Sequence, residues 1–176
     1  MDQVSNNVEA RLRRLEDKDE IRELAISYGI YVDGRDAPRL RALFTDDARF
    51  RTANGVFDSQ GGDNLVALLV GREDVAKASL HVQHGHVIDL DADNPDRATG
   101  MVYTHAEVVL HAKKMNVSAL RYDDEYHRID GQWRFAERCI KFFYRVNAAN
   151  FVEEVTSDTP VQGGETLLAA ELPYDI

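Results

Sequence analysis

The order in which two hydrophobic periodicities appear along the 176-residue chain constrains its fold more than any other feature. Residues 1–33 place apolar side chains at helical spacing, with charged residues between them. From about residue 81 to residue 148 the spacing changes to the alternation that is typical of β-strands. Helices followed by a long antiparallel meander predict an α+β domain, whose helices cover one face of a sheet that curves around a cavity.

The helical part divides in two. The first helix is expected to end at Asp33, where Gly34 can adopt the left-handed conformation that closes a helix. Asp36 is a candidate N-cap for a short second helix with Pro38 in its first turn. The chain therefore reverses direction soon after its first helix.

The segment between this turn and the meander is less regular. Asn54-Gly55 lies between alternating residues and predicts a tight hairpin. Residues 59–64 are expected to form a loop, and residues 71–78 a further short helix. The meander itself is expected to contain four strands, at residues 81–90, 97–111, 118–129 and 133–148.

Composition limits the class of protein and its partners. The formal charge of −10 would repel nucleic acid and anionic membrane surfaces, so neither is an expected partner. No apolar run reaches the roughly 20 residues of a membrane span, and the polar start predicts no signal peptide. The single cysteine, Cys139, excludes an intrachain disulfide and favours a cytoplasmic location. We expect one domain over residues 1–148 and an acidic, irregular extension over residues 149–176 that lies on the surface or contacts another subunit.

Six histidines are the first candidates for chemistry. His84 and His86 are expected to share one face of a strand and His81 the other, because side chains alternate along a strand. Two histidines without a matching carboxylate fall short of a catalytic zinc site, so no metal is expected. The pair at 84 and 86 is interpreted as solvated or as facing an interface.

His81 would need a carboxylate beside it to fix its tautomer and raise its basicity. Asp33 is the candidate, because it ends a helix whose apolar face must pack on the sheet. Its alternative role is that of an ordinary helix-end residue. Tyr28 lies roughly 140° from Asp33 around an ideal helix, so it could approach the same cavity from another side or pack in the core.

Alternation also predicts the wall of the cavity. The expected lining residues are Phe50, Thr104, Ala106, Val108, Ile140 and Phe142. Arg138 and Tyr144 are expected on the same face of the last strand as Ile140. In an apolar pocket Arg138 would suit a leaving group or an enolate oxygen. A salt bridge to a surface carboxylate is its alternative role.

Five short motifs carry a family resemblance. They are Tyr28-(four residues)-Asp33, residues 46–50, residues 71–75, Ser79-Leu80-His81 and residues 126–135. In this order they resemble the SnoaL-like branch of the nuclear-transport-factor-2-like (NTF2-like) superfamily, over about residues 8 to 146. The resemblance implies a cone-like, curved antiparallel or mixed sheet around a long N-terminal helix and short helices. That branch includes bile-acid 7α-dehydratase, scytalone dehydratase, hexachlorocyclohexane dehydrochlorinase and polyketide cyclases.

The resemblance also implies a chemistry. Lyases of this branch use an Asp–His dyad without metal or organic cofactor, and Asp33 and His81 match it by position. Tyr28 matches a pocket tyrosine of the bile-acid dehydratase, and Arg138 an arginine of the dehydrochlorinase. Ala106 stands where the bile-acid dehydratase has a second aspartate, which argues against the same steroid chemistry. The implied function is elimination of water or another small leaving group from a small hydrophobic, cyclic or aromatic substrate.

Other functions fit the same residues. An isomerase or a polyketide cyclase would use the same dyad and deliver the proton elsewhere. A non-catalytic member of the superfamily would be a ligand-binding module, or a subunit like the small β subunit of ring-hydroxylating dioxygenases. The presence of Asp33, His81 and Tyr28 together favours an enzyme. The resemblance further implies a homo-oligomer, with a trimer favoured over a dimer.

Overall fold

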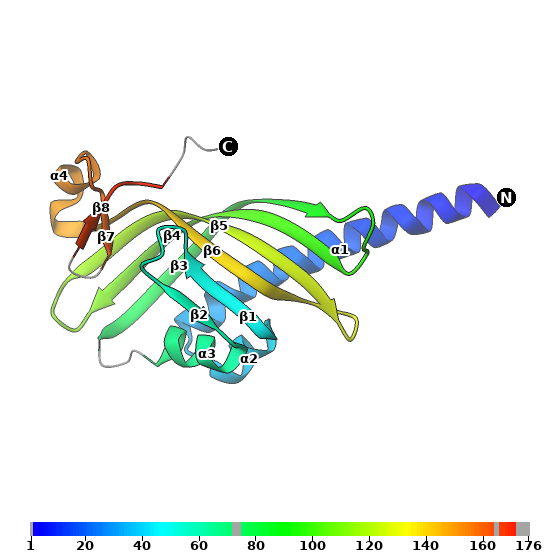
Figure 1. Ribbon diagram of the computed structural model, residues 1–176, viewed down its shortest axis with the longest axis horizontal. Coiled ribbons are helices and arrows are strands. Elements are labelled where there is room, and N and C mark those ends of the chain that lie inside the picture. The colour runs from blue at the N-terminus through cyan, green and yellow to red at the C-terminus, as the bar shows by residue number, and fades with distance from the viewer. Residues whose placement is uncertain (1, 72–74, 164–165, 172–176) are drawn as a thin grey trace.

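A computed structural model describes residues 2–71, 75–163 and 166–171 of the chain. Helices and short strands are mixed in the first part of the chain, and long strands then follow one another (Figure 1). In chain order they are α1 (Asp2–Asp33), α2 (Ala37–Ala42), β1 (Phe44–Thr52), β2 (Asp58–Gln60), α3 (Gly62–Val70), β3 (Ala76–Leu90), β4 (Arg97–Leu110), β5 (Met115–Ile129), β6 (Gln132–Asn147), a 3₁₀ turn (Ala148–Asn150), α4 (Phe151–Val155), β7 (Val161–Gly163) and β8 (Thr166–Leu168).

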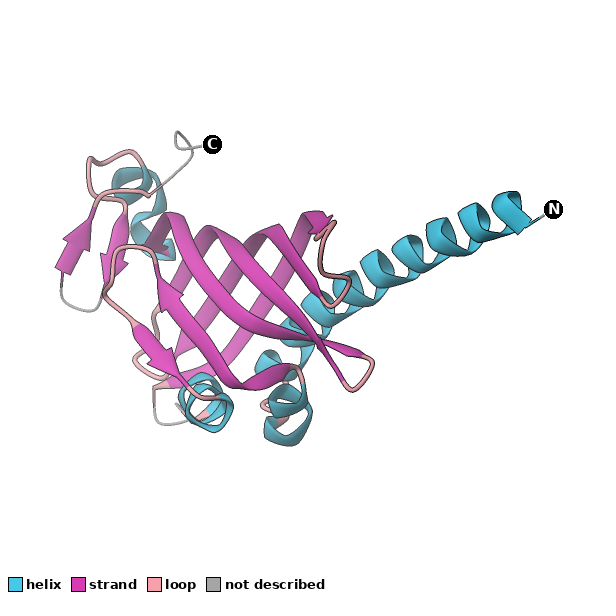
Figure 2. Cartoon of the chain, turned by 45° about the vertical axis from the view of Figure 1, so that its right-hand side comes forward, coloured by secondary structure: helices cyan, strands magenta, loops and turns pink. Residues whose placement is uncertain are grey.

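The strands form one open, curved, mixed sheet of eight strands (Figure 2). The main order is β2-β1-β6-β5-β4-β3; β7 also pairs with β6, and β8 pairs with β7. The β1–β6 and β6–β7 pairs are parallel and the remaining pairs are antiparallel. Helix α1 crosses one face of this sheet, and its N-terminal part projects beyond it (Figures 1 and 2). The α+β prediction and the curved sheet around a long first helix are confirmed.

Helix α1 ends at Asp33 as expected, but a different residue closes it. Arg35, with φ of 52°, is the left-handed residue, whereas Gly34 has no positive φ. The amide of Asp36 donates to the carbonyl of Tyr31 at 2.9 Å, and the amide of Arg35 donates to that of Val32 at 3.1 Å. This pair of bonds is a Schellman closure with an arginine in the position that glycine usually takes. The carboxylate of Asp33 is thereby fixed on the last helical turn.

The short elements that follow fit the predictions in part. The side chain of Asp36 caps α2 by accepting from the amide of Arg39 at 3.1 Å, as predicted. The Asn54-Gly55 hairpin connects β1 to β2, and Gly55 has φ of 73°. The loop expected at residues 59–64 was wrong, because β2 and the first turn of α3 occupy it.

The prediction of a helix over residues 71–78 was also wrong for those of its residues that the structure describes. Residues 76–78 already belong to the edge strand β3, whereas residues 72–74 lie outside the described part of the chain. The extension after residue 148 is not irregular either, since it contains α4, β7 and β8. Val161 of β7 is buried and pairs with Arg145 of β6.

The face of α1 that meets the sheet also covers the free edge of β3. Lys18 donates to the carbonyl of Ile88 at 2.6 Å, and the side chain of Gln83 donates to the carbonyl of Ala25. Gly29 makes the approach close, because a Cβ added there would lie 3.3 Å from the Cβ of His81. These contacts fix the position of α1 along β3, and this position determines which residues of the two elements meet in the candidate site. Among the described helices, none has the length and apolar character needed to cross a membrane.

Candidate active site

Asp33 and His81 meet where the last turn of α1 crosses β3. Nδ1 of His81 lies 2.7 Å from Oδ1 of Asp33, and the backbone amide of His81 donates to Oδ2 at 2.7 Å. The hydroxyl of Ser79 donates to Oδ1, also at 2.7 Å. One carboxylate thus holds both the ring and the backbone of the histidine.

The state of this pair follows from its hydrogen bonds. Burial opposes ionisation of Asp33, but the hydrogen bonds from His81 and Ser79 outweigh it and lower the pKa of the carboxyl. An ionised carboxylate can only accept, so Nδ1 of His81 carries the proton of this hydrogen bond. The side chains of His81 and Asp33 are 13% and 18% exposed, so both keep some contact with solvent.

Tyr28 lies beside the dyad, deep in the core. Its ring meets the imidazole of His81 edge to face, with centroids 6.3 Å apart, and it meets Tyr122 in the same way at 5.9 Å. Burial, with the neighbouring Tyr122 adding to the effect, raises the pKa of the Tyr28 hydroxyl well above its ordinary value. Tyr28 is therefore a neutral hydroxyl near the dyad at physiological pH.

Arg138 combines parts of the two surroundings that the sequence suggested, an interior position among aromatic rings and a carboxylate partner, but that carboxylate is buried rather than at the surface. It is fully buried, and its Nε and Nη2 donate to the two carboxylate oxygens of Asp124 at 2.9 and 2.8 Å. Both side chains of this ion pair are 0% exposed. The guanidinium carbon also lies 4.0–4.3 Å from the ring centroids of Tyr28, Tyr122 and Phe135. Arg138 is thus a compensated cation inside the cone.

One donor of this guanidinium remains unused. Burial opposes the charge of Arg138, but Asp124 outweighs burial and raises the pKa of the guanidinium above its ordinary value. Nη1 has no hydrogen-bond partner among the described residues, although it is buried. The hydroxyl oxygen of Thr104 is in the same situation. Two polar atoms in the interior therefore lack the acceptor or donor that buried groups normally have.

The register of the sheet places the expected wall residues. The paired residues His81 and Ala106 stand beside Ser118 in one row, and Gln83 and Thr104 in the next row stand beside Leu120 and Phe142. Of the six expected wall residues, Val108 is half-buried and the others, Phe50, Thr104, Ala106, Ile140 and Phe142, are buried. Their role in binding substrate stays a prediction.

Two expected orientations were wrong, because β-bulges reset the alternation. A bulge between Gln83 and His86 breaks the register with β4, so His86 is half-buried whereas His84 is exposed. A second shift between Ala119 and Leu120 pairs Leu120 with Phe142 and Ala119 with Tyr144. Directly paired residues share a face, so Tyr144 lies on the face opposite to Phe142.

His86 makes contacts that the sequence did not predict. Nε2 of His86 lies 3.1 Å from the hydroxyl of Tyr126, which donates to Asp124 at 2.8 Å. Burial, with Arg138 and Arg22 adding to it, lowers the pKa of His86 to about 4. His84 instead lies 2.7 Å from Nδ1 of His105 at the surface.

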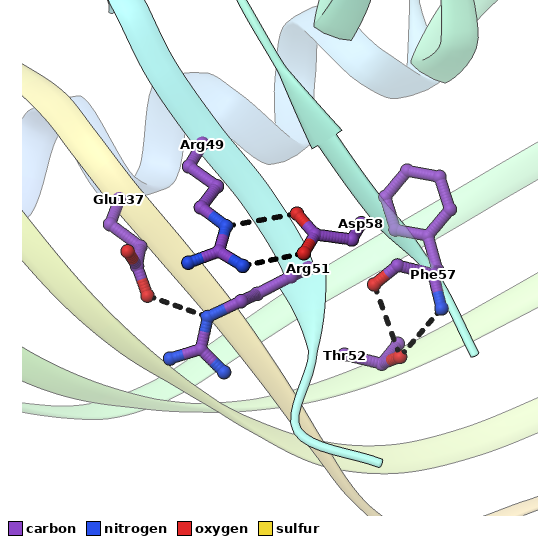
Figure 3. Close-up of polar contacts among 6 residues, drawn as sticks. All are labelled: Arg49, Arg51, Thr52, Phe57, Asp58 and Glu137. Carbon is purple, nitrogen blue, oxygen red and sulfur yellow. Dashed lines mark hydrogen bonds and ion pairs between the residues drawn. The ribbon is translucent and has the colours of Figure 1, made fainter. Parts of the chain in front are cut away.

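Two hollows lie at the margin and on the outer face of the sheet, and neither is lined by Asp33 or His81. One of about 270 Å³ lies between α1 and β3 and is lined by Arg22, Ile26, Gln83, His84 and His86. Another of about 570 Å³ lies on the outer face, where Arg51 and Glu137 form part of its lining. Figure 3 shows this face, with the ion pairs Arg49–Asp58 and Arg51–Glu137 spread across β1, β2 and β6. Its charged lining and its position across the sheet from the dyad argue against it as the reaction site.

Asp124, Tyr126 and Ser79 are site residues that sequence reasoning missed. Alternation puts Tyr122, Asp124 and Tyr126 on one face of β5, and an acid between two aromatic residues was the available signal. Its partner could not be read from that pattern. Pairing Asp124 with Arg138 requires the register between β5 and β6, which contains two irregularities.

The architecture and the dyad together define a class: a cone-shaped α+β protein of the NTF2-like kind. Within it, residues 13–139 match the model of the SnoaL-like domain, so the chain belongs to the SnoaL-like domain family. No curated protein matches the chain.

Solved structures agree with this assignment. A scytalone dehydratase candidate from Novosphingobium aromaticivorans is 21% identical, with a TM-score of 0.70 over 76% of this chain and 89% of that chain. The hexachlorocyclohexane dehydrochlorinase LinA-type3 from Novosphingobium barchaimii is 23% identical, with a TM-score of 0.69 over 79% and 94%. An NTF2-like protein with a cystatin-like fold from Novosphingobium aromaticivorans is 26% identical, with a TM-score of 0.62 over 77% and 87%. These similarities support the fold.

Proposed function

We propose that the protein is a cofactor-independent lyase that removes a small leaving group from a small hydrophobic cyclic or aromatic substrate. One observation carries the proposal: the carboxylate of Asp33 holds the Nδ1 side of His81 at 2.7 Å in a partly exposed position. An imidazole held in this way is arranged to accept a proton at Nε2. Two of the structural neighbours are named for eliminations, one as a dehydratase and one as a dehydrochlorinase.

The proposed reaction is a proton transfer coupled to bond cleavage. Nε2 of His81 takes a proton from a substrate carbon, and the electron pair of that C–H bond forms a C=C bond. The leaving group departs from the neighbouring carbon with the electrons of its own bond. The carboxylate of Asp33 stabilises the imidazolium that results, without taking its proton.

Two further groups are proposed to stabilise the charge that develops on the substrate. Tyr28 offers a neutral hydroxyl beside the imidazole, and Arg138 offers the unpartnered Nη1 next to the ring of Tyr28. Donors in an apolar interior stabilise negative charge strongly, because no water screens or competes with them. The apolar wall formed by Ile140 and Phe142 suits a hydrophobic ring.

The test is a screen followed by two variants. Wild-type protein is incubated with phenolic, steroid, polyketide-like and hexachlorocyclohexane substrates, and products are identified by mass spectrometry. For any substrate that reacts, His81→Ala should lower kcat/KM by about 10²- to 10⁴-fold, the range for loss of a general base. Asp33→Asn should lower it as well, because the amide no longer fixes the tautomer of the imidazole.

His84→Ala is the matched control, because His84 is exposed on the other side of the same strand and should not affect kcat/KM. Circular dichroism and thermal melting establish that each variant is folded. Unchanged kcat/KM in folded His81→Ala would exclude this histidine as the base. A product that retains every substrate atom would instead identify an isomerase or a cyclase.

A further inference from the structure

A chain of hydrogen bonds crosses the interior from β3 to β6. Nε2 of His86 lies 3.1 Å from the hydroxyl of Tyr126, and that hydroxyl donates to Oδ2 of Asp124 at 2.8 Å. The two carboxylate oxygens of Asp124 also accept hydrogen bonds from Nε and Nη2 of Arg138. Because the hydroxyl proton of Tyr126 is directed to Asp124, its oxygen accepts from His86, which therefore carries its proton on Nε2.

The backbone of β3 and β4 leaves room for the hydrogen bond between His86 and Tyr126. His86 and Tyr126 come from strands that lie on opposite sides of β4, so a side chain on β4 would separate them. The residue of β4 at this point is Gly100, where an added Cβ would lie 3.0 Å from both Nε2 of His86 and Cε2 of Tyr126. The bulge after Gln83 turns His86 inward to meet this gap. A bulge and a glycine on neighbouring strands thus serve the same contact.

This series of hydrogen bonds determines what Arg138 can offer to a substrate. Its charge is balanced by Asp124, and three aromatic rings hold its plane. What remains is the nitrogen Nη1, which has no hydrogen-bond partner among the described residues. A balanced ion pair whose Nη1 carries unpartnered N–H groups acts as a directed hydrogen-bond donor rather than as a free cation. Such a donor suits an oxygen atom that gains negative charge in the reaction.

We propose that His86, Tyr126 and Asp124 are positioning residues that hold Arg138 as the oxyanion-binding group of the site. The substrate would then be a phenol, an enol or a ketone, whose oxygen gains charge as His81 removes a proton. This inference rests on the proposed function and adds to it the oxygen chemistry of the substrate.

The test uses 4-nitrophenol as the probe, because its phenolate absorbs visible light and its neutral form does not. Wild-type protein should bind the phenolate in preference to the phenol, and the titration curve of the bound probe should shift to lower pH. Tyr126→Phe and His86→Leu should each weaken phenolate binding on the order of tenfold, through the loss of one buried hydrogen bond. His86→Gln should restore most of the affinity, because its amide can donate from nearly the same position as Nε2.

Two matched controls separate positioning from general damage. His84→Leu changes the neighbouring exposed histidine and should bind phenolate as the wild type does. Gly100→Ala should weaken binding, whereas Gly85→Ala should not, because a Cβ at position 85 meets nothing within 4 Å. The shift of the phenolate titration is the readout that a merely structural role would not change.

The outcomes are distinct. Equal phenolate affinity in wild type, Tyr126→Phe and His86→Leu would overturn the inference, and so would preferential binding of the neutral phenol. Retained turnover in His81→Ala would contradict the proposed function alone, because the probe measurements depend on no turnover.

Discussion

The two faces of the sheet carry ion pairs of the same chemistry in opposite surroundings. On the outer face Arg51 and Glu137 meet at 2.7 Å, with 32% and 24% of their side chains exposed (Figure 3). On the inner face Arg138 and Asp124 meet at 2.8 Å with no exposure at all. The outer pair keeps part of its water, whereas the inner pair has exchanged all of it for the ion pair itself, the Tyr126 hydroxyl and the aromatic rings around Arg138.

This difference shows on which face of the sheet the protein buries charged groups at the expense of stability. An apolar interior would be enough to pack α1 on the sheet, yet this interior contains two carboxylate pairs and a second imidazole. Buried charges are poor stabilisers compared with apolar residues of similar size. Their concentration on one face is therefore better explained by chemistry than by stability.

The largest effect is expected from breaking the inner pair. Asp124→Ala leaves Arg138 buried without a counter-charge and should lower the free energy of unfolding by about 3–5 kcal/mol. Urea denaturation followed by fluorescence measures this. Asp58→Ala is the control on the outer face, because Asp58 and its partner Arg49 are 48% and 43% exposed. Similar losses in the two variants would mean that burial does not distinguish the two faces.

A smaller effect, visible as a change with pH, is expected at His86. Because burial lowers its pKa from 6.5 to about 4, protons bind the unfolded state more readily than the folded one. Stability that is complete above pH 6.5 should therefore decline as the pH falls towards 4. His86→Leu should lack this part of the decline, whereas His84→Leu should keep it. Identical acid profiles for the wild type and His86→Leu would show that His86 is not buried in its neutral form.

The smallest effect is expected on the outer face. Glu137→Gln removes the partner of Arg51 and should change the free energy of unfolding by less than about 1 kcal/mol. The change should shrink further in 0.5 M salt, because exposed pairs are screened. A loss as large as that of Asp124→Ala would erase the contrast between the faces.

The sequence predicted the parts of the site that lie at the ends of elements. Asp33 could be paired with His81 because it ends a helix whose apolar face must pack on the sheet, although the strand expected to start at His81 in fact begins at Ala76. For Arg138, counting along one strand left an inner position and a surface salt bridge as alternatives, and the structure places it inside.

The remaining contacts depend on events that alternation does not record. Single-residue bulges turned His86 inward and Tyr144 outward, and Gly85 beside His86 was the one local hint. The pairing of Asp124 with Arg138 depends on the register between two strands, which only the folded sheet determines. The roles of the dyad and of the wall residues stay predictions.

The cover that α1 places over β3 has a consequence for solubility. A 15-residue strand at the margin of a sheet is a template onto which strands of other molecules can add. Here Lys18 occupies a carbonyl of that margin, and Asp33 occupies the amide of His81. The carboxylate proposed to serve catalysis thus also occupies an edge amide, so its loss would leave that amide open to pairing with a strand of another molecule.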